Sequence, residues 1–168
     1  MPLSSSLVGR STSPFTHTVD ARWLMAYAAG LGESAPCYFD TTATLSAHPL
    51  FPVCLEWDPI LALRFGPGTE TMSAAEQARA VHAEHDLHLY VPLRADATYT
   101  TTATAVAVEQ RKPGAYLVKR LDTHDAAGTL VSRTWQGTLY RGVEVAGTQP
   151  AADDAPAWPR FEGGDRES

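Results

Sequence analysis

The spacing of apolar side chains changes once along this chain, near residue 81, and no other feature constrains the fold as much. Before the change, Ala21, Leu24 and Ala28 recur at the i, i+3 and i+7 positions of one helical face. After it, apolar and polar residues alternate over several segments, as they do in β-strands. Helix early in the chain and strands late predict an α+β fold.

Two helices are predicted in the first half of the chain. The first covers residues 21–31 and has Asp20 as its N-cap. The second follows the start signal Asp58-Pro59 and covers residues 60–65. Because this second helix is apolar on nearly all sides, we expect it to be buried.

Strands and tight turns dominate the rest of the chain. The predicted strands cover residues 15–19, the segment from residue 81 through Val91, and residues 98–109, 116–122 and 129–141. Turns with Pro113-Gly114 and with Gly128 join the last three of them. A short buried helix followed by a long meander predicts a single hot-dog fold, in which a curved antiparallel sheet wraps around a central apolar helix.

Length and terminal composition predict one domain with two loose ends. A chain of 168 residues buries enough surface for one sizeable core. Residues 1–14 are rich in Ser, Thr and Pro and predict a flexible arm before a domain over residues 15–146. Residues 147–168 predict a disordered acidic tail, in which Trp158 and Phe161 are available to dock on the domain or on a partner.

Composition argues against several classes of protein. A net charge of −6 offers no basic excess for binding nucleic acid. Two cysteines are too few for a disulfide framework or a structural zinc site. No segment approaches the roughly 20 apolar residues that cross a bilayer. We therefore expect a cytoplasmic protein without a nucleic-acid or membrane partner.

Four stretches, in their order and spacing, resemble MaoC-like hot-dog domains. They are LVGRSTSPFTHTVDARWLMAYAAGLGE, the P-x-F-P entry in HPLFPVCLEW, the strand VHAEHDLHLYVPLRAD and the closing hairpin RKPGAYLVKRLDTHDAAGTLVSRTWQGTLYRG. Together they span roughly residues 7–143, with gaps between them. The pattern is most similar to the N-terminal half of type 2 enoyl-CoA hydratases and to the substrate-binding subunits of two-subunit 3-hydroxyacyl-thioester dehydratases.

This resemblance implies (R)-specific, reversible addition of water across a 2,3-enoyl thioester. The reaction needs a carboxylate and an imidazole on one water, and N–H donors for the thioester oxygen. Active members place the Asp and His in a D-x-N-P-(I/L)-H turn after the first helix. The matching residues 33–38 have Glu33, Ala35 and Tyr38 in place of the Asp, Asn and His. Because a tyrosine with a pKa near 10 is a poor base, we interpret this turn as degenerate.

Three side chains remain catalytic candidates: Glu33, Tyr38 and Glu56. Glu56 lies beside the predicted central helix, where a carboxylate must be paired, hydrogen-bonded or protonated, unless this segment is an exposed turn. The candidates for substrate contacts are Phe51, Trp57, Leu61, Phe65, His82 and Arg94. The four apolar ones either line an acyl pocket or form plain core. His82 matches a family position near the channel mouth, and Arg94 is either a contact for coenzyme A phosphates or a surface arginine.

No cofactor or metal site is predicted. His82, His85 and His88 are close in sequence, but on a strand His85 lies on the face opposite to the other two. Neither a P-loop nor a dinucleotide-binding fingerprint is present in the sequence.

Three hypotheses about function stay open. In the first, this chain binds the acyl group of a coenzyme A or carrier-protein thioester, and a partner hot-dog chain supplies the Asp and His. In the second, the chain is a self-sufficient hydratase or thioesterase that uses Glu33 or Glu56. In the third, it is a non-enzymatic acyl-binding or scaffold protein. Because a lone hot-dog sheet leaves unpaired edges, we expect a homodimer or a heterodimer with a catalytic MaoC-like chain.

Overall fold

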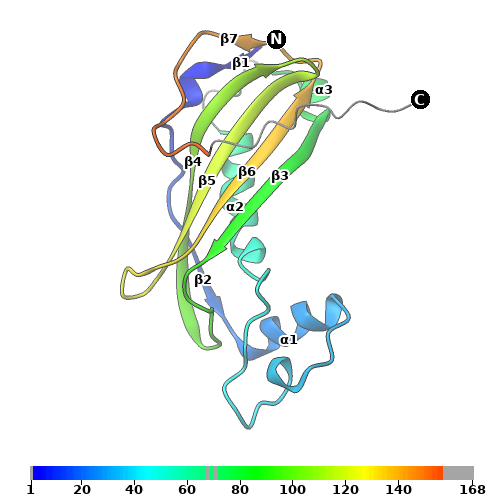
Figure 1. Ribbon diagram of the computed structural model, residues 1–168, viewed down its shortest axis with the longest axis vertical. Helices are drawn as coiled ribbons and strands as arrows, with labels where there is room; N and C mark the ends of the chain where they lie inside the picture. The colour runs from blue at the N-terminus through cyan, green and yellow to red at the C-terminus, as the bar shows by residue number, and fades with distance from the viewer. Residues whose placement is uncertain (1, 67–68, 70–71, 157–168) are drawn as a thin grey trace, which may run out of the picture.

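Five antiparallel strands form one curved sheet, and a long helix lies along its inner face (Figure 1). The structure is a computed structural model, and it describes the chain except residues 1, 67–68, 70–71 and 157–168. The strands, in their order across the sheet, are β2 (Phe15–Val19), β4 (Ala97–Arg111), β5 (Gly114–Asp125), β6 (Leu130–Arg141) and β3 (Ala80–Leu89).

The helix on the inner face is α2, which covers Val53–Arg64. The smaller elements are α1 (Ala21–Gly30), α3 (Ala74–Gln77), the 3-10 turns η1 (Ser5–Leu7) and η2 (Pro36–Tyr38), and the two-residue strands β1 (Leu3–Ser4) and β7 (Val145–Ala146). This arrangement is the predicted α+β hot-dog fold. Within the described part of the chain, no helix combines the length and apolar character that a bilayer crossing requires.

The first helix and the meander follow their local sequence signals. Asp20 caps α1 by accepting a hydrogen bond from the backbone N–H of Trp23 at 2.7 Å. The turn into β5 depends on Gly114, which has a φ of 151°. A Cβ there would lie 2.1 Å from the carbonyl oxygen of Tyr140, so a side chain cannot be accommodated without moving the backbone.

The central helix begins at Val53, earlier than predicted. The Asp-Pro pair that resembles a helix start lies inside α2, where Pro59 removes one backbone hydrogen bond. Pro59 shares a buried face with Leu55 and Leu63, and their packing against the sheet stabilises the helix despite this loss. Phe65 lies just beyond the helix and is 62% exposed, so the prediction that it is buried is wrong.

The N-terminal segment is also better anchored than its composition predicts. Leu3 and Leu7 are fully buried, in the same core cluster as Leu63 and Tyr140. β1 pairs in parallel with β7, near the other end of the chain. The polar composition of this segment predicts a flexible arm, whereas the structure packs two of its leucines in the core.

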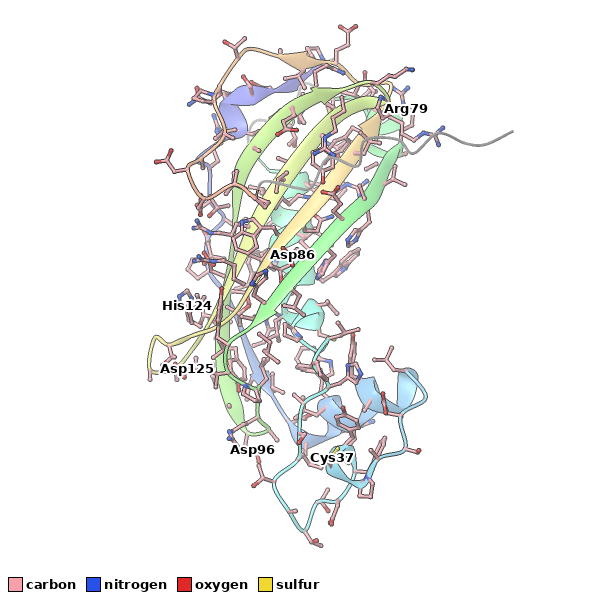
Figure 2. All side chains as sticks on the ribbon, viewed as in Figure 1. Cys37, Arg79, Asp86, Asp96, His124 and Asp125 are labelled. Atoms are coloured by element: carbon pink, nitrogen blue, oxygen red, sulfur yellow. The ribbon has the colours of Figure 1, made fainter. Side chains whose placement is uncertain are left out.

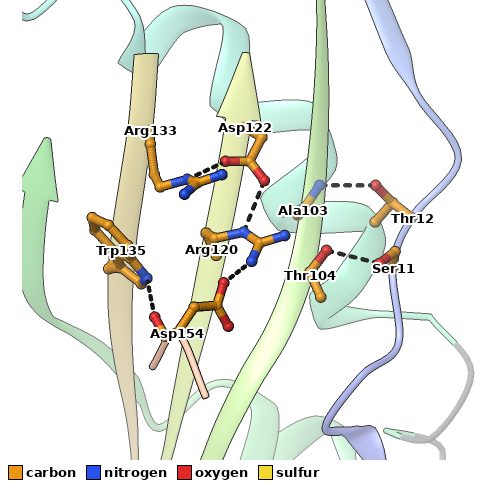
Figure 3. Close-up of polar contacts among 9 residues, drawn as sticks. All are labelled: Ser11, Thr12, Ala103, Thr104, Arg120, Asp122, Arg133, Trp135 and Asp154. Atoms are coloured by element: carbon orange, nitrogen blue, oxygen red, sulfur yellow. Dashed lines mark hydrogen bonds and ion pairs between the residues drawn. The ribbon is translucent and has the colours of Figure 1, made fainter. Parts of the chain in front are cut away.

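Beyond β7 the chain crosses the outer face of the sheet until the described residues end. Asp154 forms an ion pair with Arg120, and its carbonyl oxygen accepts a hydrogen bond from Trp135 Nε1 at 3.2 Å (Figure 3). These contacts attach the described part of the acidic segment to the sheet. Trp158 and Phe161, the two predicted docking residues, lie outside the described residues.

The face of β6 that points toward α2 is polar. Its buried side chains with hydrogen-bonding groups are Ser132, Thr134, Gln136, Thr138 and Tyr140. On the opposite face, Trp135 and Leu139 pack in an outer apolar cluster. Buried residues between a sheet and a helix are usually apolar, so the hydrogen-bonding groups on this face of β6 mark a candidate functional site.

Candidate functional site

A cavity of about 750 Å³ opens beside α2, between this helix and the inner face of the sheet. Its volume lies within the range of small-molecule sites. The wall is mainly apolar, and its apolar members include Trp23, Tyr27, Leu50, Val53, Ile60 and Leu61. Polar side chains from α2, β3, β5 and β6 complete it.

The cavity follows the length of α2. Val53 in the first turn and Arg64 in the last turn both contribute to the wall. At a rise of about 1.5 Å per residue, a helix of 12 residues is about 18 Å long. An elongated and mostly apolar cavity suits a chain-like ligand.

Glu56 is a fully buried carboxyl group in the middle of this wall. The hydroxyl of Thr134 donates a hydrogen bond to its Oε1 at 2.5 Å. Its Oε2 lies 3.6 Å from Nε2 of His85, and among the described residues it has no hydrogen-bond partner. Burial raises the pKa of Glu56 to about 7, although the Thr134 hydrogen bond acts in the opposite direction.

His85, on β3, is the partner of Glu56 in this contact and also lines the cavity. Neither of its ring nitrogens has a hydrogen-bond partner in the described part of the chain. Burial, followed by the neighbouring His82, lowers the pKa of His85. Both members of the pair are therefore biased toward their neutral forms, a protonated acid beside a free imidazole.

Lys119 is a buried cation on β5 in the same wall. Its Nζ donates to Oε1 of Gln136 and to Oγ1 of Thr138, each at 2.7 Å. Burial, followed by the charge of Arg64, lowers the pKa of Lys119 to about 7. The sequence gives almost no sign of these three polar residues beyond a lysine inside the apolar run YLVKRL.

The turn that matches the family's catalytic motif contributes no residue to this wall. Figure 2 shows Cys37, in η2, near α1 and at the opposite end of the molecule from Arg79. Glu33 Oε1 lies 3.5 Å from Nε2 of His48, and the ring of Tyr38 lies 5.7 Å from the ring of His48. Glu33 and Tyr38 thus meet at one imidazole, which comes from residue 48 rather than 38.

His48 does not supply the missing base. Its Nδ1 accepts the backbone N–H of Leu50 at 3.2 Å, which assigns the ring proton to Nε2, the nitrogen that faces Glu33. No ring lone pair is then left to take a proton from water. Desolvation and the neighbouring Cys37 raise the pKa of Tyr38, which makes it a poorer proton donor at neutral pH.

The structure separates the remaining candidates. Trp57, Leu61 and His82 line the cavity together with Glu56. Because Glu56 is buried within α2, the alternative of an exposed turn does not apply. Three expected substrate contacts lie outside this cavity wall: Phe51, Phe65 and Arg94.

Each of these three has a different environment. Phe51 is buried in an aromatic cluster, with its ring 5.3 Å from Trp23 and 5.5 Å from Tyr27. Phe65 is exposed and lies under the guanidinium of Arg64. The backbone N–H of Arg94 donates to the Tyr99 hydroxyl, in a loop beside a different surface pocket. No group of three or more potential metal ligands occurs within the described ranges.

Comparison with protein families gives a match over most of the chain. Residues 6–133 match the family described as "FAS1-like, dehydratase domain region". A UPF0336 protein of Streptomyces coelicolor is 27% identical over 152 residues, which cover 87% of this chain and 100% of that protein.

Solved structures show the same fold. A MaoC-like dehydratase from Phytophthora capsici is 24% identical with a TM-score of 0.67, and the match covers 89% of this chain and 51% of that one. This chain therefore spans about half the length of that protein. The HadBC (3R-hydroxyacyl-ACP dehydratase) complex from Mycobacterium tuberculosis has a chain that is 16% identical with a TM-score of 0.66, covering 79% of this chain and 96% of its own length.

Proposed function

The chain belongs to the FAS1-like dehydratase family, and from this premise we propose that it is the acyl-thioester-binding component of an (R)-specific 2-enoyl-thioester hydratase, which in reverse is a 3-hydroxyacyl-thioester dehydratase. In this proposal the acyl group lies in the cavity along α2. A partner hot-dog chain supplies the Asp and His that exchange protons with water.

One combination of features supports this division of labour. The chain has a cavity of about 750 Å³, yet its matching catalytic turn has Tyr38 in the position of the imidazole. Trp57 and Leu61 then contact the acyl group, and His82 lies beside it. A chain that binds substrate without reacting groups requires a second chain to complete the site.

The sheet offers an edge for such a partner. Within the described residues, β3 pairs with β6 on one side only. Val81 and Leu89 on this edge strand are 43% and 37% exposed. An unpaired edge with apolar side chains is a surface that a second hot-dog sheet can extend. A second copy of this chain would cover the edge equally well but would bring no imidazole at position 38.

The proposal is tested by assaying the chain with crotonyl-CoA and with longer 2-enoyl thioesters. We expect binding of the thioester and no efficient hydration by the chain alone. Adding a catalytic hot-dog chain, encoded beside this one and carrying an intact D-x-N-P-x-H turn, should give full activity. Full hydration by the isolated chain would contradict the division of labour, and binding without turnover under any pairing would indicate a scaffold.

Glu56 and His85 support a second candidate, a self-sufficient hydratase or thioesterase. They place a carboxyl group and an imidazole in one cavity wall, 3.6 Å apart. In this case the Glu56→Gln variant should abolish the turnover of the isolated chain. A Glu144→Gln variant is the matched control, because Glu144 is exposed and does not line the cavity.

A further inference from the structure

Two cationic side chains lie at the cavity end beside the last turn of α2. Lys119 projects from β5 and is 1% exposed, and Arg64 belongs to the last helical turn. Both contribute to the cavity wall. The charge of Arg64 helps to lower the pKa of Lys119, so the two cations are close enough to repel each other.

Their hydrogen bonds leave part of their donor capacity unused. An ammonium has three N–H groups, and Lys119 directs two of them at the neutral acceptors Gln136 and Thr138. No described residue accepts from the third. Arg64 donates from one terminal nitrogen to the carbonyl oxygen of Gln77 at 2.6 Å, while its Nε lacks a partner among the described residues.

No carboxylate of the described residues forms an ion pair with either cation. Glu56 is the buried acid of the described core, but its oxygens face Thr134 and His85 instead. Buried charges are normally paired, because removing an ion from water without a partner is costly. An alkyl chain filling this end of the cavity would give Lys119 no counter-charge and favour its neutral amine, whereas an anion would keep it protonated.

We propose that this end of the cavity binds a carboxylate carried by the acyl chain, so that the preferred substrates are thioesters of dicarboxylic acids rather than of simple fatty acids. The inference rests on the proposed function, because it assumes that the acyl group lies along α2. The carboxylate accepts hydrogen bonds from Lys119 and Arg64 and neutralises the repulsion between them.

The apolar wall of the cavity explains why the proposed carboxylate belongs to an acyl chain and is not a free anion. The wall between the ends of the cavity includes Val53, Ile60 and Leu61. A free inorganic anion gains nothing from such a surface, whereas the methylene groups of an acyl chain are stabilised by it. An aliphatic chain that ends in a carboxylate therefore matches both parts of the cavity.

The test compares thioesters that differ only at the distal end of the acyl chain. Octanoyl-CoA, 8-hydroxyoctanoyl-CoA and the mono-CoA thioester of octanedioic acid are titrated into the full chain, with a dodecanoyl series to vary the length. Binding is followed by calorimetry and by tryptophan fluorescence, since Trp23 and Trp57 line the cavity. We expect the carboxylate-ended thioester to bind about ten-fold more tightly than the plain one at the matching length, because hydrogen bonds between charged groups are stronger than neutral ones.

Lys119→Met is the diagnostic variant, because methionine keeps an unbranched apolar stem and removes the charge. It should bind plain acyl thioesters at least as well as the wild type and lose the preference for the carboxylate. The chain offers a matched control in Lys112→Met, since Lys112 is its other lysine and lies exposed in the turn before β5. This control should retain the preference in full.

The outcomes separate this inference from the function on which it rests. Equal affinity for the plain and carboxylate-ended thioesters at both lengths overturns the inference and leaves the proposed function standing. A preference for the hydroxyl-ended thioester shows a neutral oxygen site and also contradicts the carboxylate assignment. If no thioester binds, both proposals are wrong.

Discussion

Oε2 of Glu56 and Nε2 of His85 lie 3.6 Å apart, and neither atom has a hydrogen-bond partner among the described residues. One atom belongs to the central helix and the other to the edge strand β3, so the contact joins two elements of the cavity wall. A polar ligand in the cavity would bridge the two atoms. A small movement of β3 would bring them within hydrogen-bond distance of each other. The pair is therefore sensitive both to the charge state of Glu56 and to the contents of the cavity.

Burial of Glu56 predicts a specific pH dependence of stability. Because the pKa is raised from 4.5 to about 7, the folded state retains a proton that the unfolded state has already released. The stability of the wild type relative to Glu56→Gln should be highest below pH 4.5 and fall as the pH rises to 7. Over this range the loss is at most about 3 kcal/mol, from 1.36 kcal/mol per pKa unit. Thermal or urea unfolding of both proteins between pH 4 and 8 measures it.

The matched control is Glu144→Gln, since Glu144 is exposed. Its stability difference from the wild type should stay nearly constant over the same pH range. If the stability difference between the wild type and Glu56→Gln does not change with pH, Glu56 ionises in the folded protein as readily as in the unfolded one. The structural assignment of a buried acid would then be wrong.

Local signals in the sequence predicted most of the fold. The Asp20 cap, the alternation of the meander and the glycine turns depend on residues a few positions apart, and each was found as predicted. Signals that depend on distant contacts were missed. Leu3 reads as part of a polar arm until β1 pairs with β7, and Pro59 reads as a helix start until its burial within α2 is known.

The candidate site was harder to predict than the fold. Glu56 was recognisable because a carboxylate beside an apolar helix needs a reason. Lys119 was not, because strand alternation defines two faces without indicating which of them meets the helix. The polar residues of β6 have the same ambiguity. Which face is buried is decided by tertiary packing, and here the face with threonine and glutamine is turned inward.

Trp57 is expected to contribute to ligand binding and little to stability. It lines the cavity but is 59% exposed, so Trp57→Ala removes apolar contact with the acyl chain and leaves no internal void. We expect acyl-thioester affinity to fall about ten-fold, which corresponds to roughly 1.4 kcal/mol of lost apolar contact, with an almost unchanged melting temperature. Phe65→Ala, at a similarly exposed site outside the wall, should leave affinity unchanged. Equal affinity in Trp57→Ala and the wild type would place the acyl group elsewhere.

Phe51 should show the opposite behaviour. Its side chain is fully buried between Trp23 and Tyr27, so Phe51→Ala creates a cavity in the aromatic cluster. The expected loss is about 3–5 kcal/mol in the free energy of unfolding, measured by urea denaturation. The comparison with Phe65→Ala, which should cost well under about 1 kcal/mol, isolates the effect of burial. A small loss at position 51 would show that the aromatic cluster is loosely packed.

Leu7 tests whether the N-terminal segment is part of the core. Because Leu7 is fully buried beside Leu63 and Tyr140, Leu7→Ala should destabilise the fold by about 2–5 kcal/mol. Leu31→Ala, at a site that is 50% exposed, is the control and should change the free energy of unfolding little. If both variants have the same urea midpoint of unfolding as the wild type, the segment behaves as the flexible arm that its composition predicts.

Lys119→Met should stabilise the protein, most strongly at and below neutral pH. Burial and the charge of Arg64 lower the pKa of Lys119 from 10.5 to about 7, so the folded state loses a proton that the unfolded state keeps. The cost of burying the charge is complete below pH 7 and disappears as the pH rises toward 10.5. Replacing the lysine with an apolar side chain removes this cost, and unfolding measured at pH 6 and at pH 9.5 should show a gain on the order of 1 kcal/mol or more at pH 6 that shrinks at the higher pH. A destabilised Lys119→Met at pH 6 would mean that the hydrogen bonds to Gln136 and Thr138 outweigh the cost of desolvation, and that the ammonium is a structural group without need of a ligand.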